Sequence, residues 1–263
     1  MGATYLEDIV AHHRARAARD ERPWRDRVDA VRTRGPSFAA ALRAGDTVAV
    51  IAEVKRRSPS KGWIDRDLDP SALASAYERG GAAAVSVLTD AEFFAGTLRD
   101  LANVRAATAL PVLRKDFTLG ANDVVDAAEM GASAVLLIVA ALSDVELRLY
   151  LDVAAQVDLD ALVEVHDEVE AHRALDAGAT LVGVNQRDLH TFEVDVQRAA
   201  RVAAVLPAHI VAVAESGLAS RDDVAAAAAA GVDAVLIGET LVRASNPEER
   251  VRELCGVARV ARA

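Results

Sequence analysis

The chain has 263 residues, of which 52% are hydrophobic, 27% charged and 4% aromatic. This balance supplies enough apolar surface for a sizeable core and excludes a disordered or collagen-like chain. The net charge of −10 argues against a nucleic-acid partner, because a phosphate backbone would be repelled. Eight arginines in residues 14–34 are interspersed with acidic residues and indicate a solvated helical face.

The single cysteine, Cys255, excludes an internal disulfide and a cysteine-based zinc site. The sequence contains neither the apolar run of about 18 residues that a membrane-spanning helix needs nor a signal-peptide pattern. The six histidines show no metal-ligand spacing. We therefore expect a cytoplasmic protein without a metal site or a membrane partner.

Residues 1–47 precede the first predicted strand. Apolar residues at helical spacing, first Leu6 and Ile9 and then Val28 and Val31, predict two helices in this segment. We expect these helices to pack outside the remaining fold, either at its base or beside its opening.

From residue 48 onward, short β-branched runs alternate with alanine-rich amphipathic segments. The runs are largely apolar and bounded by Gly, Pro or polar residues, as expected of strands that are buried on both faces. Helices are predicted between them, for example over residues 123–130, 168–177 and 222–230. Eight strands are predicted, over residues 48–55, 82–89, 110–117, 132–139, 161–166, 180–187, 210–216 and 233–240.

Glycines at positions 81, 131, 178 and 231 each precede a strand and suit the left-handed residue that ends a helix. They mark every second strand–helix unit. Eight such units in roughly 215 residues predict an α/β fold, a (β/α)8 TIM barrel over residues 48–263, with residues 1–47 as an N-terminal helical extension of a single domain. A doubly wound open sheet is the alternative, but no G-x-G-x-x-G motif follows a strand.

Only three of the 30 basic residues are lysines, namely Lys55, Lys61 and Lys115. In a chain that otherwise uses arginine, a lysine marks a position of interest. A desolvated lysine can donate or accept a proton, whereas arginine holds its proton.

Ionisable residues gather at the carboxyl ends of the predicted strands, where such barrels have their active sites. Side chains of a strand alternate between its faces, so Glu53 and Lys55 both point inward at the end of the first strand. Unpaired buried charges are costly, so this gathering favours an acid–base site over strand ends that merely become polar. The other strands contribute Lys115, Glu164, Asn185, Arg187 and Glu215.

Gly217 and Gly238 follow the seventh and eighth strands, whose loops bind phosphate in many barrels. Glu239 suits such a site only if its backbone N–H faces the phosphate and its carboxylate faces away. The basic, hydroxylated residues 56–62 after the first strand suggest a lid over an anionic substrate. Phenylalanines after the second and third strands suggest an aromatic slot, with ordinary loop packing as the alternative.

Residues 51–62, IAEVKRRSPSKG, resemble the signature of the indole-3-glycerol phosphate synthase family. The resemblance implies a TIM-barrel carboxy-lyase of tryptophan biosynthesis that needs no cofactor. Its substrate would be 1-(2-carboxyphenylamino)-1-deoxyribulose 5-phosphate, which closes to an indole with loss of CO₂ and water. The likeness covers nearly the whole chain in order and continues through residues 87–90, 110–117, 162–166, 183–189 and 214–217.

The resemblance also implies residue roles. Lys115 would be the general acid that protonates the ketone oxygen, and Glu164 and Lys55 would serve the later deprotonation and dehydration. Glu53 and Asn185 would orient and polarise the substrate. Glu215 would complete the polar ring. Substrate binding would involve Ser58, Phe94, Phe117, Arg187, Leu189, Ser216, Gly217, Gly238 and Glu239.

Three alternatives stay open. A Schiff-base aldolase would use Lys55 or Lys115 as its nucleophile. A sugar-phosphate isomerase would need a cysteine or paired aspartates at strand ends, where this chain has Lys55 and Glu164. An inactive phosphate-binding paralogue should have lost a lysine or glutamate of the rim. In each case the partner is a small phosphorylated molecule, and we expect a monomer or weak homodimer.

Overall fold

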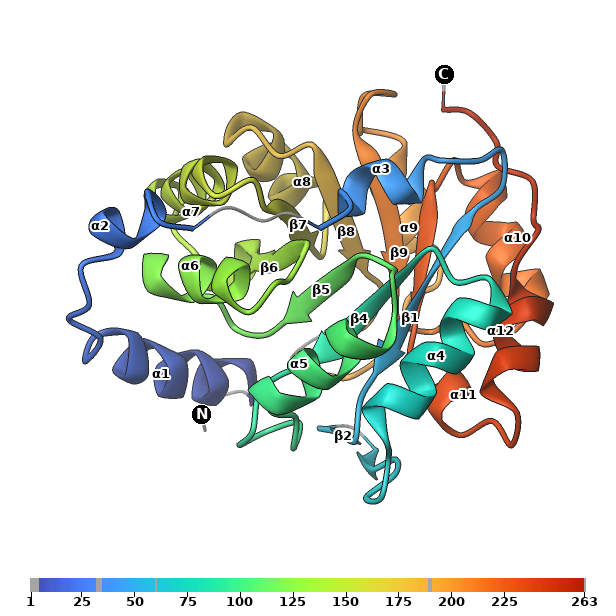
Figure 1. Cartoon of the computed structure of the whole chain (residues 1–263). Helices are drawn as coiled ribbons and strands as arrows, with labels where there is room; N and C mark the ends of the chain where they lie inside the picture. Colours follow the sequence, from blue (N-terminus) through green and yellow to red (C-terminus); the bar gives the residue numbers. More distant parts are fainter. Residues whose placement is uncertain (1–4, 32–34, 60, 189–190, 263) are drawn as a thin grey trace.

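Parallel strands form a closed barrel in the computed structural model, which describes residues 5–31, 35–59, 61–188 and 191–262 (Figure 1). The order around the barrel is β1-β10-β9-β8-β7-β6-β5-β4, and the predicted (β/α)8 class is confirmed. The barrel strands are β1 (Ala49–Val54), β4 (Ala84–Leu88), β5 (Val112–Lys115), β6 (Ala134–Ile138), β7 (Asp160–Val165), β8 (Leu181–Asn185), β9 (Val211–Glu215) and β10 (Ala234–Ile237).

Each barrel strand is followed by helical structure that covers the outside of the barrel (Figure 1). The prediction that the last strand reaches residue 240 is wrong, because Gly238 ends β10 and is the N-cap of a short helix. The helices are α4 (Pro70–Gly80), α5 (Leu98–Ala107), α6 (Ala121–Glu129), α7 (Asp144–Gln156), α8 (Glu168–Asp176), α9 (Arg198–Ala203), α10 (Arg221–Ala229), α11 (Glu239–Val242) and α12 (Pro247–Leu254), with a 3₁₀ turn, η1 (Val139–Ala141).

Local sequence signals define the helix ends. Capping boxes led by Thr97, Ser143 and Ser220 begin α5, α7 and α10, so side chains satisfy the first backbone N–H groups. The four glycines predicted to be left-handed have φ between 77° and 97°. That prediction is confirmed, and it explains why each of these helices stops where the chain turns back into the barrel.

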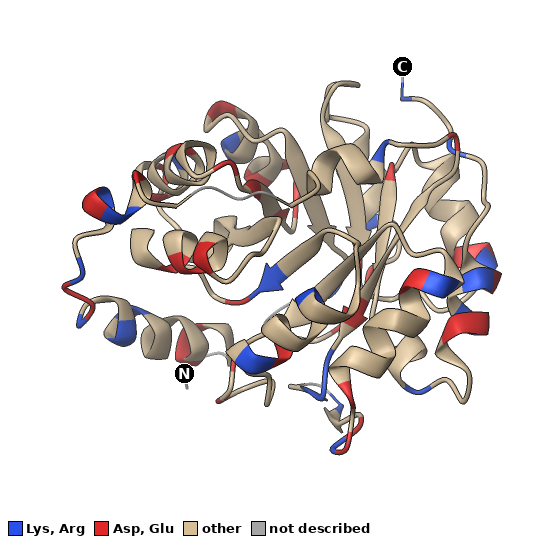
Figure 2. Cartoon of the chain, viewed as in Figure 1, with Lys and Arg blue, Asp and Glu red and all other residues tan. Residues whose placement is uncertain are grey.

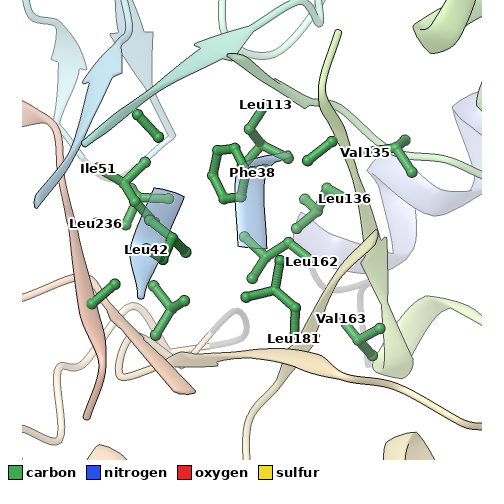
Figure 3. Packing of buried hydrophobic residues seen from close by; sticks show 14 of the residues in the cluster. Phe38, Leu42, Ile51, Leu113, Val135, Leu136, Leu162, Val163, Leu181 and Leu236 are labelled. Carbon is green, nitrogen blue, oxygen red and sulfur yellow. The ribbon is translucent and has the colours of Figure 1, made fainter. Parts of the chain in front are cut away.

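The base of the barrel is closed by α3 (Phe38–Leu42). Phe38 and Leu42 lie among the interior residues of the barrel strands and are 0% and 1% exposed (Figure 3). Ser37, the N-cap of this helix, donates a hydrogen bond to Asp160 at the amino end of β7, 2.9 Å away. This helix was not predicted, because five residues are too few to show a helical period.

The rest of the N-terminal segment forms α1 (Tyr5–Ala17) and α2 (Trp24–Val28). Figure 1 shows α1 at the end of the barrel opposite α3, so the extension reaches both the opening and the base. Its described arginines are mostly exposed, as predicted, and several of them also pair with carboxylates of the barrel. Arg16 lies 2.6 Å from Asp123, and Arg22 lies 2.8 Å from Asp126; both aspartates are on α6. Ion pairs with α6 therefore dock the extension.

Charge is mixed over the molecule. Basic and acidic segments alternate along α1, α2 and α12 (Figure 2). Within the described parts of the chain, no helix has the length and hydrophobicity needed to cross a membrane.

Candidate active site

A cavity of about 440 Å³ opens at the carboxyl ends of the barrel strands. Every candidate residue that the structure describes lines it, and Leu189 lies outside the described residues. Residues at the ends of the strands or directly after them line its floor: Glu53, Lys55, Lys115, Glu164, Asn185 and Glu215. Residues from the loops line its walls and rim: Ser58, Phe94, Phe117, Arg187, Ser216, Gly217, Gly238 and Glu239.

Lys115 lies at the centre of the floor, at the end of β5. Its Nζ is 2.9 Å from Oε2 of Glu164 on β7 and 3.5 Å from Oε2 of Glu215 on β9. Burial alone would lower the pKa of Lys115, but the carboxylates of Glu164, Glu215 and Glu53 outweigh burial and raise it. The ammonium therefore stays protonated throughout the neutral pH range.

Glu164 and Glu215 share Lys115 but differ in charge. Burial would raise the pKa of Glu164, yet Lys115 and His166 lower it below its ordinary value, and Asn185 donates a hydrogen bond to its Oε1 at 3.1 Å. Burial raises the pKa of Glu215 to about 8, because the attraction of Lys115 is opposed by the charges of Glu164 and Glu53. Of the two carboxyl groups that contact Lys115, Glu164 is thus ionised and Glu215 neutral at pH 7, a pattern typical of acid–base sites.

The backbone makes room for these side chains at glycines. A Cβ atom on Gly183 would lie 2.1 Å from Oε1 of Glu215. A Cβ atom on Gly238 would lie 2.3 Å from Oε1 of Glu53 and 3.2 Å from Nζ of Lys55. Glu53 and Lys55 themselves form an ion pair at the end of β1. The two glycines therefore contribute to the site because the absence of a Cβ atom leaves space for the side chains of Glu215 and Glu53.

The loops after β9 and β10, which were predicted to bind phosphate, form one side of the rim. Ser216 and Gly217 are both left-handed, with φ of 67° and 75°, so the chain turns sharply over the cavity. Ser216 Oγ also donates to Oδ1 of Asn185 at 2.9 Å, which ties this loop to the floor. The carboxylate of Glu239 lies 3.0 Å from Nε of Arg243, a lining residue that the sequence analysis missed. The i,i+4 spacing of this pair was the available signal.

The aromatic wall comes from the loops after β4 and β5. The rings of Phe94 and Phe117 have centroids 6.4 Å apart and planes tilted by 37°, so they form adjoining walls. Phe192 also lines the cavity and was missed; its loop has no apolar periodicity that would reveal it. The expected lid contains a small hairpin of β2 (Arg57–Ser58) and β3 (Gly62–Trp63). Arg57 donates to the backbone oxygen of Phe93 at 2.9 Å and so links the hairpin to the aromatic wall.

The fold and the site together define the class of the protein. It is a (β/α)8-barrel enzyme whose cavity joins buried acid–base groups to two loops of the kind that hold phosphate. Residues 6–254 match the family model described as indole-3-glycerol phosphate synthase. The chain belongs to the indole-3-glycerol phosphate synthase family, and the resemblance noted in the sequence is confirmed.

Relatives that carry this name are similar over most of their length. The protein of Beutenbergia cavernae is 48% identical over 255 residues, which cover 95% of this chain and 94% of the relative. The protein of Micrococcus luteus is 52% identical over 217 residues, 81% of each chain. A solved structure of thiamine phosphate pyrophosphorylase from Pyrococcus furiosus has a TM-score of 0.61 and covers 83% of this chain and 96% of its own. At 16% identity, that likeness supports the fold alone.

Proposed function

We propose that the protein is an indole-3-glycerol phosphate synthase, a carboxy-lyase of tryptophan biosynthesis. It converts 1-(2-carboxyphenylamino)-1-deoxyribulose 5-phosphate into indole-3-glycerol phosphate, CO₂ and water, without a cofactor. The observation that carries this proposal is the partly buried ammonium of Lys115 between Glu164 and Glu215, in a cavity whose rim includes the loops after β9 and β10.

Lys115 acts first, as the general acid. The ring carbon that bears the carboxylate attacks the ketone carbon, and the ketone oxygen takes a proton from the ammonium. Proton transfer is favourable because the developing alkoxide is more basic than the amine that remains. The positive charge of Lys115 also stabilises this oxygen before the proton moves, in a site where water is largely excluded.

The later steps use groups beside Lys115. When CO₂ leaves, the electrons of the broken bond return to the positively charged ring nitrogen, so the substrate supplies its own electron sink. The new hydroxyl group then leaves as water after protonation, and the neighbouring carbon loses a proton to form the indole double bond. Glu164, which is ionised, and Lys55 serve these transfers. Asn185 fixes the carboxylate of Glu164 through its amide.

The cavity walls hold the substrate so that the two reacting carbons meet. The aromatic ring packs against Phe94 and Phe117, with Leu189 as a further contact predicted from the family resemblance. Arg187 and Ser58 bind polar groups of the substrate at the rim. The phosphate is bound by Lys55 and by the two loops after β9 and β10, through Ser216, Gly217, Gly238 and Glu239. The pairing of Glu239 with Arg243 removes the repulsion that a free carboxylate would exert.

Indole fluorescence tests the proposal directly. The wild-type protein should convert the carboxyphenylamino-deoxyribulose phosphate into a fluorescent indole. Lys115→Met and Glu164→Gln should each reduce kcat by at least about 10², the low end of acid–base contributions. Lys115→Arg should be folded and inactive, because guanidinium does not release its proton. As a control, Arg148→Met, at an exposed position of α7, should leave kcat unchanged.

The same preparation separates the proposal from the aldolase alternative. Borohydride reduction in the presence of a ketose phosphate should leave no covalent adduct on Lys55 or Lys115, because neither acts as a nucleophile in ring closure. A trapped lysine adduct, or normal turnover by both Lys115→Met and Glu164→Gln, would contradict the mechanism.

We further propose that the enzyme works in the cytoplasm as a monomer or weak homodimer. The free thiol of Cys255 is typical of a protein from a reducing compartment. Among the described residues, most exposed large hydrophobic side chains, such as Leu98, Val145 and Val205, lie on different elements, and only Val194 and Val196 share a loop, which supports a small interface or none.

A further inference from the structure

His13 of α1 lies far from the proposed chemistry in sequence but next to it in space. Its Nε2 is 2.7 Å from Oδ2 of Asp90, which follows β4, and both side chains are buried. Figure 1 shows α1 beside the loop that leads into α5. Asp90 lines the cavity, whereas His13 is not among the described residues that do. His13 thus contacts the site from behind.

Asp90 organises the loop that carries Phe94. Its Oδ1 accepts hydrogen bonds from the backbone N–H groups of Phe93 and Phe94, at 2.6 and 3.0 Å, while its Oδ2 accepts from His13. Burial would raise the pKa of Asp90, but the hydrogen bonds from His13 and from the two amides lower it. One ionised carboxylate therefore joins α1 to the backbone of the aromatic wall.

The imidazole ring of His13 also supports the second aromatic residue of the wall. Its centroid is 5.3 Å from that of Phe117, and the two planes differ by 27°, which is a stacked arrangement. Phe117 follows β5 and lines the cavity. His13 therefore supports both halves of the wall. It stacks directly on Phe117, and it acts on Phe94 indirectly, by its hydrogen bond to Asp90.

A metal site is the other interpretation of this cluster, since His13, Asp90 and Asp116 have ligand atoms within 4.8 Å of one another. The donors do not fit it. Asp116 already accepts hydrogen bonds from Thr89 and from Arg114, at 2.6 and 3.0 Å. Both of those bonds end on Oδ2, and Oδ1 accepts from the backbone N–H of Phe117 at 2.8 Å, so a cation would have to displace one of these donors. The geometry suits an organic hydrogen-bond network rather than a metal ion.

We propose that His13 is a positioning residue for the aromatic slot: its hydrogen bond to Asp90 and its stacking on Phe117 hold the two phenylalanine walls at the spacing that accepts the substrate ring. This inference rests on the proposed function, because it assigns the slot to the carboxyphenyl ring of the substrate. Lys115 and Glu164 are on barrel strands and do not contact His13. Loss of His13 should therefore weaken substrate binding, seen as a higher KM, and have little effect on the rate of the chemical steps, seen as kcat.

Two variants separate the two contacts of His13. His13→Gln retains a donor for Asp90 and loses the stacked ring, whereas His13→Phe retains a ring and loses the donor. His13→Ala, which loses both contacts, should raise KM at least about tenfold, a change of about 1.4 kcal/mol in binding, with kcat changed less than about threefold. Both single-contact variants should have KM values between wild type and His13→Ala. The exposed His172 on α8 is the matched control, and His172→Ala should match wild type in both constants.

Hydrogen exchange gives a readout that does not depend on activity. The amide hydrogens of Phe93 and Phe94 should exchange at least about tenfold faster in His13→Ala and His13→Phe, because Asp90 is no longer fixed. His13→Gln should restore protection, and the amides of β6 should be unchanged in all variants. Unchanged exchange at these two amides in His13→Ala, or equal losses in kcat and kcat/KM, would overturn the positioning role. A wild-type protein that forms no indole would refute the proposed function, while the exchange data would still decide the role of His13.

Discussion

Glu215 shows how a single residue in this site derives its properties from its surroundings. Burial of the carboxyl group raises the pKa of Glu215 to about 8, because the charges of Glu164 and Glu53 oppose the attraction of the neighbouring Lys115. A neutral Glu215 can donate a hydrogen bond to a substrate oxygen, which an ionised carboxylate cannot. It also limits the negative charge around Lys115, so that the ammonium remains available to the ketone oxygen.

This raised pKa has a consequence for stability. Between the ordinary glutamate value of 4.5 and about 8, the folded protein retains a proton on Glu215 that the unfolded chain has lost. The contribution of Glu215 to the free energy of unfolding is therefore fully present below pH 4.5 and is lost as the pH rises through about 8. Glu215→Gln should remove this part of the pH dependence.

Urea unfolding at several values between pH 5 and pH 8 measures the effect. The difference in unfolding free energy between wild type and Glu215→Gln should shift against the wild type as the pH rises. Glu146→Gln is the matched control. The hydrogen bond from Arg14 lowers the pKa of Glu146 to about 2, so Glu146 titrates below this range and the difference between wild type and Glu146→Gln should stay nearly constant. A difference that stays constant for Glu215→Gln over the whole interval would contradict the raised pKa.

Side-chain alternation along strands was sufficient to predict that Lys115, Glu164 and Glu215 point into one cavity. It could not predict which carboxyl group is neutral, since that depends on distances between three strands. His13 was missed for the same reason, because only the fold brings it next to Asp90. Arg243 had a local signal, its i,i+4 spacing from Glu239, which the sequence analysis did not use.

Among the elements, the turn between β10 and α11 is the most constrained by the site. Gly238 ends the strand and lets Glu53 and Lys55 approach the backbone. Gly238→Ala should reduce kcat/KM by about 10²-fold, because moving a reacting or binding group by about 1 Å can cost that much. Steady-state kinetics with indole fluorescence measure it. Gly45→Ala should be silent, since a Cβ atom at Gly45 meets nothing within 4 Å. Equal kinetics for the two variants would show that the space at Gly238 is not needed.

Elements with strong local signals were predicted well. The helix α10 was predictable because its run of alanines has a high helix propensity. The ends of the helices before the even-numbered predicted strands were predictable because a glycine, such as Gly231, readily adopts the left-handed φ needed there. The short helix α3 has only its N-cap, Ser37, as a local signal. Its helical state depends on the barrel base into which Phe38 packs, and such tertiary effects leave no period in the sequence.

On the scale of the whole molecule, Phe38 joins the extension to the barrel. We propose that residues 1–47 and 48–263 unfold as one cooperative domain. Phe38→Ala should lower the free energy of unfolding by about 3–5 kcal/mol, because it leaves a cavity in the base of the barrel. Val145, which is 73% exposed, is the control, and Val145→Ala should cost less than about 0.5 kcal/mol.

Chemical denaturation followed by fluorescence and by circular dichroism checks both parts of this prediction. Coincident transitions from the two probes are expected for a single domain. Two separate transitions, with Phe38→Ala moving only one of them, would show instead that the extension folds apart from the barrel.

The closure of the barrel has a consequence for synthesis of the chain. β1 pairs with β10, Ala49 opposite Ala234, and Val48 donates a hydrogen bond to the backbone oxygen of Val257. During translation, one edge of β1 therefore remains unpaired until residues 234–257 have left the ribosome. Until they arrive, an apolar strand edge is open to wrong partners. The nascent chain should depend most on chaperones until β10 is available, and a chain truncated before β10 should aggregate.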